Sequence, residues 1–326
     1  MFRVSPLSLL ALAAILFFPF AGCSPPANSS ADKEEHSKTA ALKHKFAGQH
    51  PIKIVCTTGM VSDLARNVGG KHVEVKALMG AGVDPHLYKA SPGDLSLMSN
   101  ADMVLYSGWH LEGKMTEVFD NLAREKPAIP VAERGISHDQ ILEVDGGAHD
   151  PHVWFDVSLW SLAAGAVRDA LIEFDPPNAA DYKANAAAYQ ERLAKLHEEA
   201  KTQIATIPKD QRVMVTAHDA FRYFGRAYDI DVRGIQGIST ESEAGVKQIN
   251  DLVAFLTQRK IKAVFVETSV SDQNIKSLLE GSAAGGHKVV IGGELYSDAM
   301  GEDGTPEGTY EGMVRHNVET IVKALR

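Results

Sequence analysis

From residue 51 onward, hydrophobic positions follow two alternating patterns. Short apolar runs bounded by glycine, proline or polar clusters predict buried strands, and longer amphipathic stretches predict helices between them. This alternation predicts an α/β fold with mostly parallel sheets. The expected strands are Ile52–Thr58, Val73–Met79, Ala101–Ser107 and Ala128–Ala132, then Arg212–Ala217, Val232–Ile238, Lys262–Thr268 and Lys288–Leu295, with helices such as Glu243–Gln258 and Asp272–Leu279 between them.

A long helical pattern separates the two halves of the chain. Asn178 is a candidate N-cap, and apolar side chains then recur at steps of four and three residues from Tyr182 to Ile204. No glycine or proline interrupts the pattern before Pro208. We therefore predict two α/β lobes, each with a mostly parallel sheet flanked by helices, joined by one long rigid helix that permits only small opening. The predicted ranges are 51–177, 178–207 for the linking helix, and 208–326.

The N-terminus has the pattern of an export signal. A basic start is followed by an apolar run from Leu7 to Phe20, which is short for a membrane-spanning helix and typical of a signal-peptide core. The run ends in Phe20-Ala21-Gly22-Cys23, which is similar to a bacterial lipobox, where the cysteine is lipidated and becomes the first residue. We predict a lipoprotein signal peptide over residues 1–23 with the lipid on Cys23. The alternative is ordinary cleavage near Ala21, which would release a secreted protein.

Residues 24–50 show no apolar periodicity and are rich in Ala, Ser, Lys, Glu and His, so we predict a flexible tether with solvated histidines. The chain has two cysteines. If Cys23 carries a lipid, Cys56 has no disulfide partner. Because it lies in the strand pattern that begins at Ile52, we predict that Cys56 is a small buried hydrophobic residue.

Composition narrows the class of protein. Of the 326 residues, 44% are hydrophobic and 23% are charged, as in globular proteins with a large core. The net charge of −9 argues against nucleic-acid binding, which usually requires a basic surface. A mean hydropathy of −0.13 excludes a multi-span membrane protein. Two cysteines exclude disulfide-rich scaffolds and cysteine-based zinc ribbons, whereas thirteen histidines are a first indication of chemistry.

Three histidines and one aspartate occupy suggestive positions. His86 and His152 each follow Asp-Pro, and the proline stiffens the turn that presents the imidazole. His218 ends one apolar strand pattern and Asp298 follows another. In open α/β sheets, ligands bind beyond the carboxyl ends of the strands. The residues alone leave open whether these side chains bind a metal or are ordinary polar residues, because no short-range metal motif such as His-Glu-x-x-His is present.

The chain contains, in this order, the motifs Asp84-Pro85-His86-Leu87-Tyr88, Asp150-Pro151-His152-Val153-Trp154, Thr216-Ala217-His218-Asp219-Ala220-Phe221, Phe265-Val266-Glu267-Thr268 and Gly293-Glu294-Leu295-Tyr296-Ser297-Asp298-Ala299-Met300-Gly301. Together these motifs resemble one family: the metal-binding solute-binding proteins of zinc and manganese ABC transporters, and within it the TroA-like branch. The similarity runs from about Ile52 to the C-terminus. It implies two α/β lobes, a rigid linking helix and a metal in the cleft between the lobes.

The resemblance implies that His86 and His152 from the first lobe, with His218 and Asp298 from the second, hold the metal. Many manganese-specific members have glutamate at the position of His218, and many zinc-specific members carry a long histidine-rich loop that this chain lacks. The expected ligand is therefore one divalent transition metal, Zn²⁺ or Mn²⁺; imidazole suits zinc and carboxylate oxygen helps manganese. Glu267, at a strand end beside the cleft, either orients a ligand or forms a structural ion pair.

These features predict a receptor rather than an enzyme. We expect an exported monomer, lipid-anchored to the membrane and either periplasmic or on the cell surface, that delivers the metal to an ABC permease and its ATPase. One alternative is a zinc hydrolase with three histidines and a bound water, but Asp298 would close the coordination shell. A second is a surface adhesin, although no repeat or adhesive tract is visible. We expect packing or surface roles for the histidines and tryptophans without a ligand assignment: His72, His110, His197, His287, His316, Trp109, Trp154 and Trp160.

Overall fold

The structure is a computed structural model that describes residues 44–144 and 146–326. The predicted signal peptide, the lipidation site Cys23 and residues 24–43 of the predicted tether lie outside the described residues. From residue 44 onward, the described chain packs as one compact unit, so the lobe boundaries proposed from the sequence stay predictions. Within the described ranges, no helix combines the length and the apolar character needed to cross a membrane.

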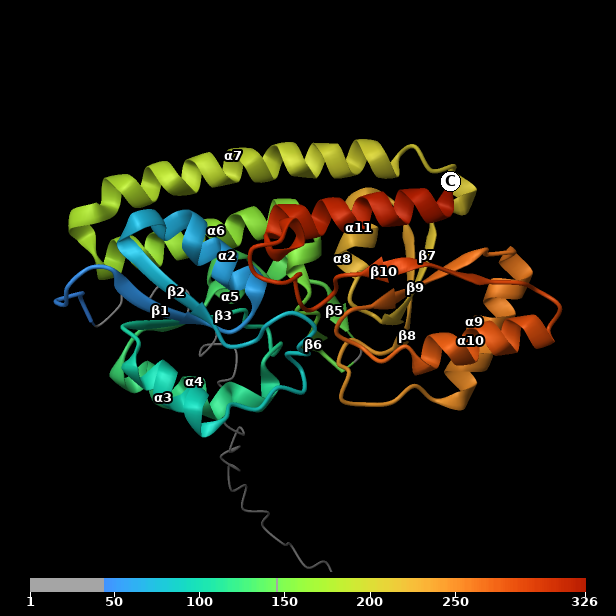
Figure 1. The fold of residues 1–326 in the computed structure, drawn as a ribbon, viewed down its shortest axis with the longest axis horizontal. Helices are drawn as coiled ribbons and strands as arrows, with labels where there is room; N and C mark the ends of the chain where they lie inside the picture. Colours follow the sequence, from blue (N-terminus) through green and yellow to red (C-terminus); the bar gives the residue numbers. More distant parts are fainter. Residues whose placement is uncertain (1–43, 145) are drawn as a thin grey trace, which may run out of the picture. The chain divides into compact units, whose positions relative to one another are not determined.

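The first half of the chain builds a four-stranded parallel sheet in the order β2-β1-β3-β4. The predicted strand Ala128–Ala132 ends early, because the backbone turns into a short helix at Val131. We call this sheet with its helices the first lobe (Figure 1). Its elements are β1 (Ile52–Cys56), α2 (Gly59–Gly69), β2 (Val73–Ala77), α3 (Pro92–Asn100), β3 (Met103–Tyr106), α4 (Thr116–Glu125), β4 (Ala128–Pro130), α5 (Val131–Gly135) and α6 (Val157–Phe174).

The second half contains two parallel strand pairs, β7 with β8 and β9 with β10. Strands β7 and β9 lie next to each other, so the pairs together form the sheet layer of the second lobe. A short antiparallel hairpin that the sequence did not predict, β5 (Glu143–Val144) with β6 (Ala148–His149), precedes α6. The second lobe comprises β7 (Val213–His218), α8 (Arg222–Tyr228), β8 (Asp231–Gln236), α9 (Val246–Arg259), β9 (Ala263–Glu267), α10 (Gln273–Ala284), β10 (Val290–Leu295) and α11 (Tyr310–Leu325).

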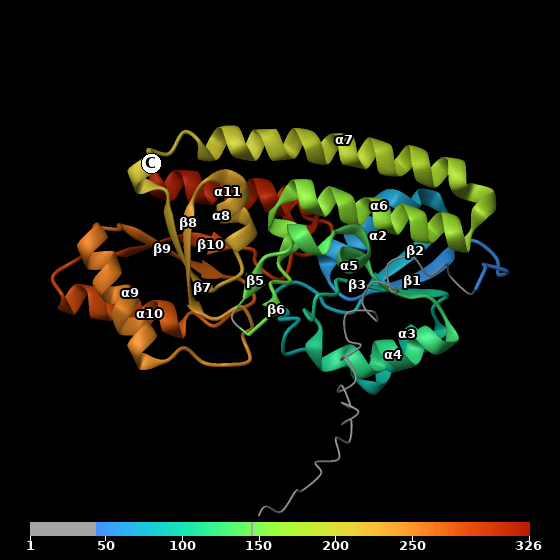
Figure 2. The same cartoon turned by 180° about the vertical axis from the view of Figure 1, so that it is seen from behind.

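Helix α7 (Ala179–Ile204) is a single unbroken helix of 26 residues, as predicted. It packs against α6 and α2 of the first lobe and against α11 of the second, and both views show it running alongside these helices (Figures 1 and 2). Asn178 precedes the helix, but its side chain does not cap it; the amide donates instead to Asp175 Oδ2 at 2.8 Å. The buried positions of α7 match the predicted stripe: Tyr182, Ala186, Tyr189, Leu193, Leu196, Ala200 and Ile204.

The end of the predicted tether is attached to the fold. The Phe46 N–H donates to the carbonyl of Phe174 at 2.7 Å, and the two rings lie 5.6 Å apart. His50 Nε2 lies 3.6 Å from a carboxylate oxygen of Asp175. The attached part of the chain therefore begins before residue 51, because an apolar side chain at position 46 packs on the end of α6. Cys56 is fully buried in the core, as predicted, and this burial raises its pKa to about 12.

Candidate metal site

Each candidate ligand is presented by a short, well-defined piece of backbone. His86 lies in the loop between β2 and α3, and its N–H donates to Asp84 Oδ1 at 2.8 Å. His152 follows β6, and its N–H donates to Asp150 Oδ1 at 3.1 Å. Both Asp-Pro-His turns are thus closed by their own aspartate. The other two candidates lie at strand ends in the second lobe, where open sheets bind ligands: His218 ends β7 and Asp298 follows β10.

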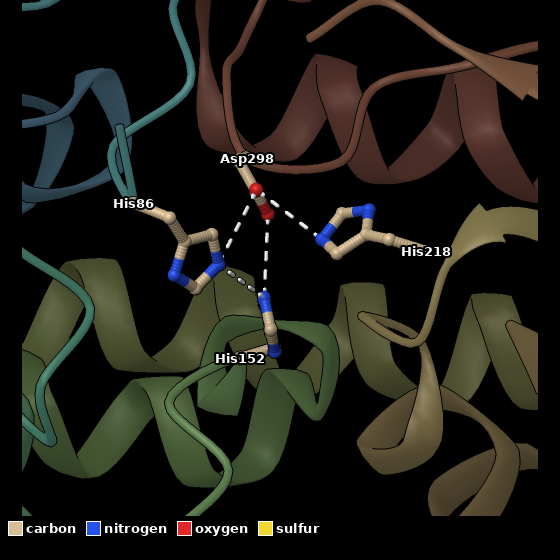
Figure 3. A group of neighbouring side chains, drawn as sticks. All are labelled: His86, His152, His218 and Asp298. Carbon is tan, nitrogen blue, oxygen red and sulfur yellow. Dashed lines mark hydrogen bonds and ion pairs between the residues drawn. The ribbon is translucent and has the colours of Figure 1, made fainter. Parts of the chain in front are cut away.

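The structure brings these four side chains together from distant parts of the chain (Figure 3). One ligand atom from each lies within 4.8 Å of the others, and all four residues are buried. His86 Nε2 is 3.2 Å from His152 Nε2, and His218 Nε2 is 3.2 Å from Asp298 Oδ2. Asp298 also lies 3.5 Å from His152 Nε2 and 3.7 Å from His86 Nε2. In the described part of the chain, this is the one group of three or more His, Cys, Asp or Glu side chains arranged to hold a metal.

Several of these converging atoms have no satisfactory partner within the protein. His218 Nε2 and both oxygens of Asp298 are buried without a well-formed hydrogen bond. Burying unpaired polar atoms costs free energy, and such atoms at a convergence point indicate a ligand that the protein is built to receive. Three imidazole nitrogens and a carboxylate form a donor set suited to a divalent transition metal. The residues present therefore fit a metal ion.

The buried environment sets the protonation of the cluster. The pKa of His86 is lowered to about 3: burial lowers it most, Asp298 opposes that effect, and the nearby His152 and His218 also lower it. Burial alone would raise the pKa of Asp298, but the surrounding histidines, His218 above all, hold it well below its usual value. Burial lowers the pKa of His218, yet Glu267 and Asp298 together raise it well above its usual value. The metal-free site thus combines an ionised aspartate, a neutral His86 and a protonated His218.

Carboxylates orient two of the three imidazoles. Asp150 Oδ1 lies 2.8 Å from His152 Nδ1. Glu267 contacts His218 twice: Oε2 lies 2.6 Å from Nδ1, and Oε1 accepts the backbone N–H at 2.9 Å. A carboxylate on Nδ1 keeps a proton on that nitrogen, so in the neutral imidazole that binds a metal the Nε2 lone pair is directed at the cluster. Glu267 thus contacts His218 in the way that both expected roles require, because the same carboxylate orients the ring and forms an ion pair with it.

The sequence did not single out Asp150 or Asp84 as supporting residues, although both stand two positions before a histidine in the same motif. That repeated Asp-Pro-His spacing was the available signal. Trp154 is buried, as predicted, but it also contacts the site region, because its Nε1 donates to the carbonyl of Ser297 at 3.1 Å.

The histidines and tryptophans for which packing or surface roles were predicted lie outside the cluster. His72 Nε2 lies 2.7 Å from Asp181 Oδ2, and His287 Nε2 lies 2.7 Å from the carbonyl of Ile261. These are surface or packing contacts of the kind predicted. His197 Nδ1 lies 3.3 Å from the Tyr228 hydroxyl, and His316 Nε2 lies 3.1 Å from the Glu294 carbonyl. Of the remaining residues in this set, His110 is exposed, and Trp109 and Trp160 are buried.

Comparison with known proteins agrees with this geometry. The family model described as zinc-uptake complex component A, periplasmic, matches residues 54–324. The manganese-binding lipoprotein MntA of Bacillus subtilis is 46% identical over 318 residues, covering 97% of this chain and 98% of that protein. The zinc-binding protein TroA of Treponema pallidum is 47% identical over 272 residues, covering 83% of this chain and 88% of that protein.

Solved structures show the same relationship. The periplasmic zinc-binding protein TroA from Treponema pallidum superposes with a TM-score of 0.82 at 46% identity, covering 85% of this chain and 99% of that one. The family model spans nearly all of the described residues, and the sequence and fold similarities extend over the same part of the chain. The chain therefore belongs to the zinc-uptake component A family, the metal-binding solute-binding proteins of zinc and manganese ABC transporters.

Proposed function

We propose that this protein captures one divalent transition metal ion, Zn²⁺ or Mn²⁺, outside the cytoplasm and delivers it to the permease of an ABC importer. The ligands are His86, His152, His218 and Asp298. The observation that carries the proposal is the convergence of their four ligand atoms within 4.8 Å in a buried setting. Relatives named as manganese-binding and zinc-binding proteins support it. The metal is cargo rather than a resident cofactor.

The ligand set explains how such a receptor handles its cargo. Three neutral imidazoles and one carboxylate carry a formal charge of −1, so a bound divalent cation leaves the site at +1 and buries little net charge. Each ligand must be deprotonated to bind, so capture releases the proton held by His218. By the Irving–Williams order, zinc binds more tightly than manganese in vitro. Tighter zinc binding therefore does not identify the metal that the cell imports.

The same ligand set favours transport over catalysis. A zinc hydrolase keeps one coordination position open for the water that it activates. Here Asp298 occupies the fourth position and offers two oxygens, which closes the coordination shell. Relatives named as substrate-binding lipoproteins of metal ABC transporters also support a receptor that performs no chemistry on its ligand.

We further propose that the receptor is a monomer held at the outer side of the cell membrane by a lipid on Cys23, with a cognate permease and ATPase as its partners. The lipobox-like sequence before Cys23 supports the anchor. So does the description of relatives as lipoproteins, including one that matches 97% of this chain. Several acyl chains on one residue anchor a protein stably, whereas a single chain does not.

The test is metal content together with metal-dependent stability, measured on wild type, His218→Ala and His316→Ala. Wild type should bind one metal ion, and the metal should raise its melting temperature, since a ligand at 1,000 times its Kd stabilises by ~4 kcal/mol. His218→Ala should lose most of that stabilisation because a buried ligand is gone. His316→Ala is the matched control, because His316 lies on α11 outside the cluster. Equal behaviour of the two variants would refute the ligand assignment.

A further inference from the structure

The four ligand-bearing segments are not held equally firmly. The segments of His152 and Asp298 are joined to each other through Trp154, which is fully buried. Its Nε1 donates to the carbonyl of Ser297, and its own carbonyl accepts the Tyr310 hydroxyl at 2.6 Å. His218 belongs to a strand, and Glu267 binds both its ring and its backbone. Three ligands are therefore fixed by the core of the protein.

His86 is supported differently. Like His152 and Asp298 it lies outside the helices and strands, but its loop is the long one between β2 and α3, which no fully buried tryptophan joins to the segment of another ligand. Gly82 in this loop has a φ of 71°, in the left-handed region that favours glycine. Leu87, directly after the ligand, is half exposed. This loop is the part of the site with the least regular structure around it, so its position depends on individual side-chain contacts.

One of those contacts reaches across from the second lobe. Asp84 uses Oδ1 to accept the His86 N–H, and its Oδ2 accepts the Thr240 hydroxyl at 2.6 Å. Thr240 lies 156 residues further along the chain, in the segment between β8 and α9, and only 8% of it is exposed. A buried hydrogen bond to a carboxylate is stronger than one between neutral groups. The Thr240 hydroxyl thus holds Asp84, and Asp84 holds the backbone of His86.

We propose that Thr240 is a positioning residue for the metal site: through Asp84 it holds the His86 loop against the other three ligands and so slows release of the metal. This inference rests on the proposed function. The contact joins the loop-borne ligand to the lobe that supplies His218 and Asp298. When the contact breaks, His86 is the ligand that is free to withdraw while the other three stay in place.

Thr240→Val tests the proposal, because valine keeps the β-branched shape and removes the hydroxyl. The rate of Zn²⁺ loss from the purified, zinc-loaded protein is measured by stopped flow with an excess of chelator. Removal of a group that supports a metal ligand costs 10–100-fold in affinity, and because Thr240 acts through Asp84 we expect the lower end, a rise in off-rate of about tenfold. Thr240→Ser keeps the hydroxyl and should stay within about twofold of wild type.

The matched control is Glu241→Gln. Glu241 is the neighbouring residue, and its carboxylate lies 2.7 Å from Lys114 Nζ in a half-exposed ion pair that also joins this segment to the first lobe. Its loss should leave the off-rate near that of wild type, since exposed ion pairs contribute little. The proposal is overturned if Thr240→Val releases zinc at the wild-type rate, if Thr240→Ser releases it as fast as Thr240→Val, or if Glu241→Gln accelerates release equally. Failure of the proposed function is a separate result, in which wild type takes up no zinc.

Discussion

Glu267→Gln isolates the role of a side chain that orients a ligand without belonging to the proposed ligand set. In the native protein both oxygens of Glu267 accept hydrogen bonds from His218, one from the ring and one from the backbone. Glutamine has one oxygen and one NH₂ group. The backbone N–H can only donate, so it keeps the amide oxygen, and the NH₂ then faces Nδ1. That arrangement favours the tautomer with its proton on Nε2, the atom that points at the cluster.

The size of the effect follows from burial. Glu267 is 4% exposed and His218 is fully buried, so water cannot replace the lost acceptor. A buried group left with the wrong partner costs ~1–3 kcal/mol. Because 1.4 kcal/mol corresponds to a factor of ten, metal affinity should fall about 10–100-fold. Loss of the Glu267 charge has an opposing effect on metal affinity, because it lowers the pKa of His218 and so eases competition between the metal and a proton. This opposing effect is smaller at mildly alkaline pH.

The assay is competitive titration of zinc against a chromophoric chelator at mildly alkaline pH. Glu294→Gln is the control, since Glu294 is exposed on β10 and the same substitution there removes the same charge. It should bind zinc as wild type does. If Glu267→Gln and Glu294→Gln both keep the wild-type affinity, Glu267 does not set the tautomer of His218 and the reasoning from its two contacts fails.

Two further predictions concern protons and location. His218 has a pKa well above its usual value, so the metal-free site holds a proton at neutral pH that the metal must displace. Metal affinity should therefore rise with pH through the neutral range. Calorimetry in buffers of different ionisation enthalpy should detect about one proton released per metal ion bound. Binding without proton release would contradict this assignment. Cys23→Ala should move the protein from the membrane fraction to the soluble exported fraction, measured by fractionation and by the mass of the N-terminus. Unchanged membrane association would show that another feature anchors the chain.

The local pattern of hydrophobic and polar residues was sufficient to predict most of the helices and strands. The seven buried positions of α7 are those of the predicted stripe, because helical periodicity directly reports which face lies against the core. The predicted strands agree with the observed ones to within a few residues. Expectations failed where a local signal competed with packing. Asn178 binds Asp175 instead of capping α7. Phe46 attaches to the end of α6 a polar segment that was predicted to belong to the flexible tether.

The four candidate ligands were also accessible from the sequence, through the resemblance of their motifs to a known family. The residues alone left the metal site open, because no two ligands lie within one short motif. His86 and His152 are 66 residues apart, yet their Nε2 atoms are 3.2 Å apart in the fold. That proximity depends on how the first lobe folds, and the approach of His218 and Asp298 to the two histidines depends on how the second lobe packs against the first.

What the sequence by itself determined is the order of strands and helices, the linking helix and the residue types able to hold a metal. Tertiary structure decided which atoms of those residues meet and what holds them there. Glu267 faces His218 only because β9 lies beside β7, and Thr240 reaches Asp84 only because a segment of the second lobe passes the loop of His86. The physical reason is range: periodicity reports the environment of neighbouring residues, whereas a buried hydrogen bond between side chains 156 residues apart exists only once both lobes have packed.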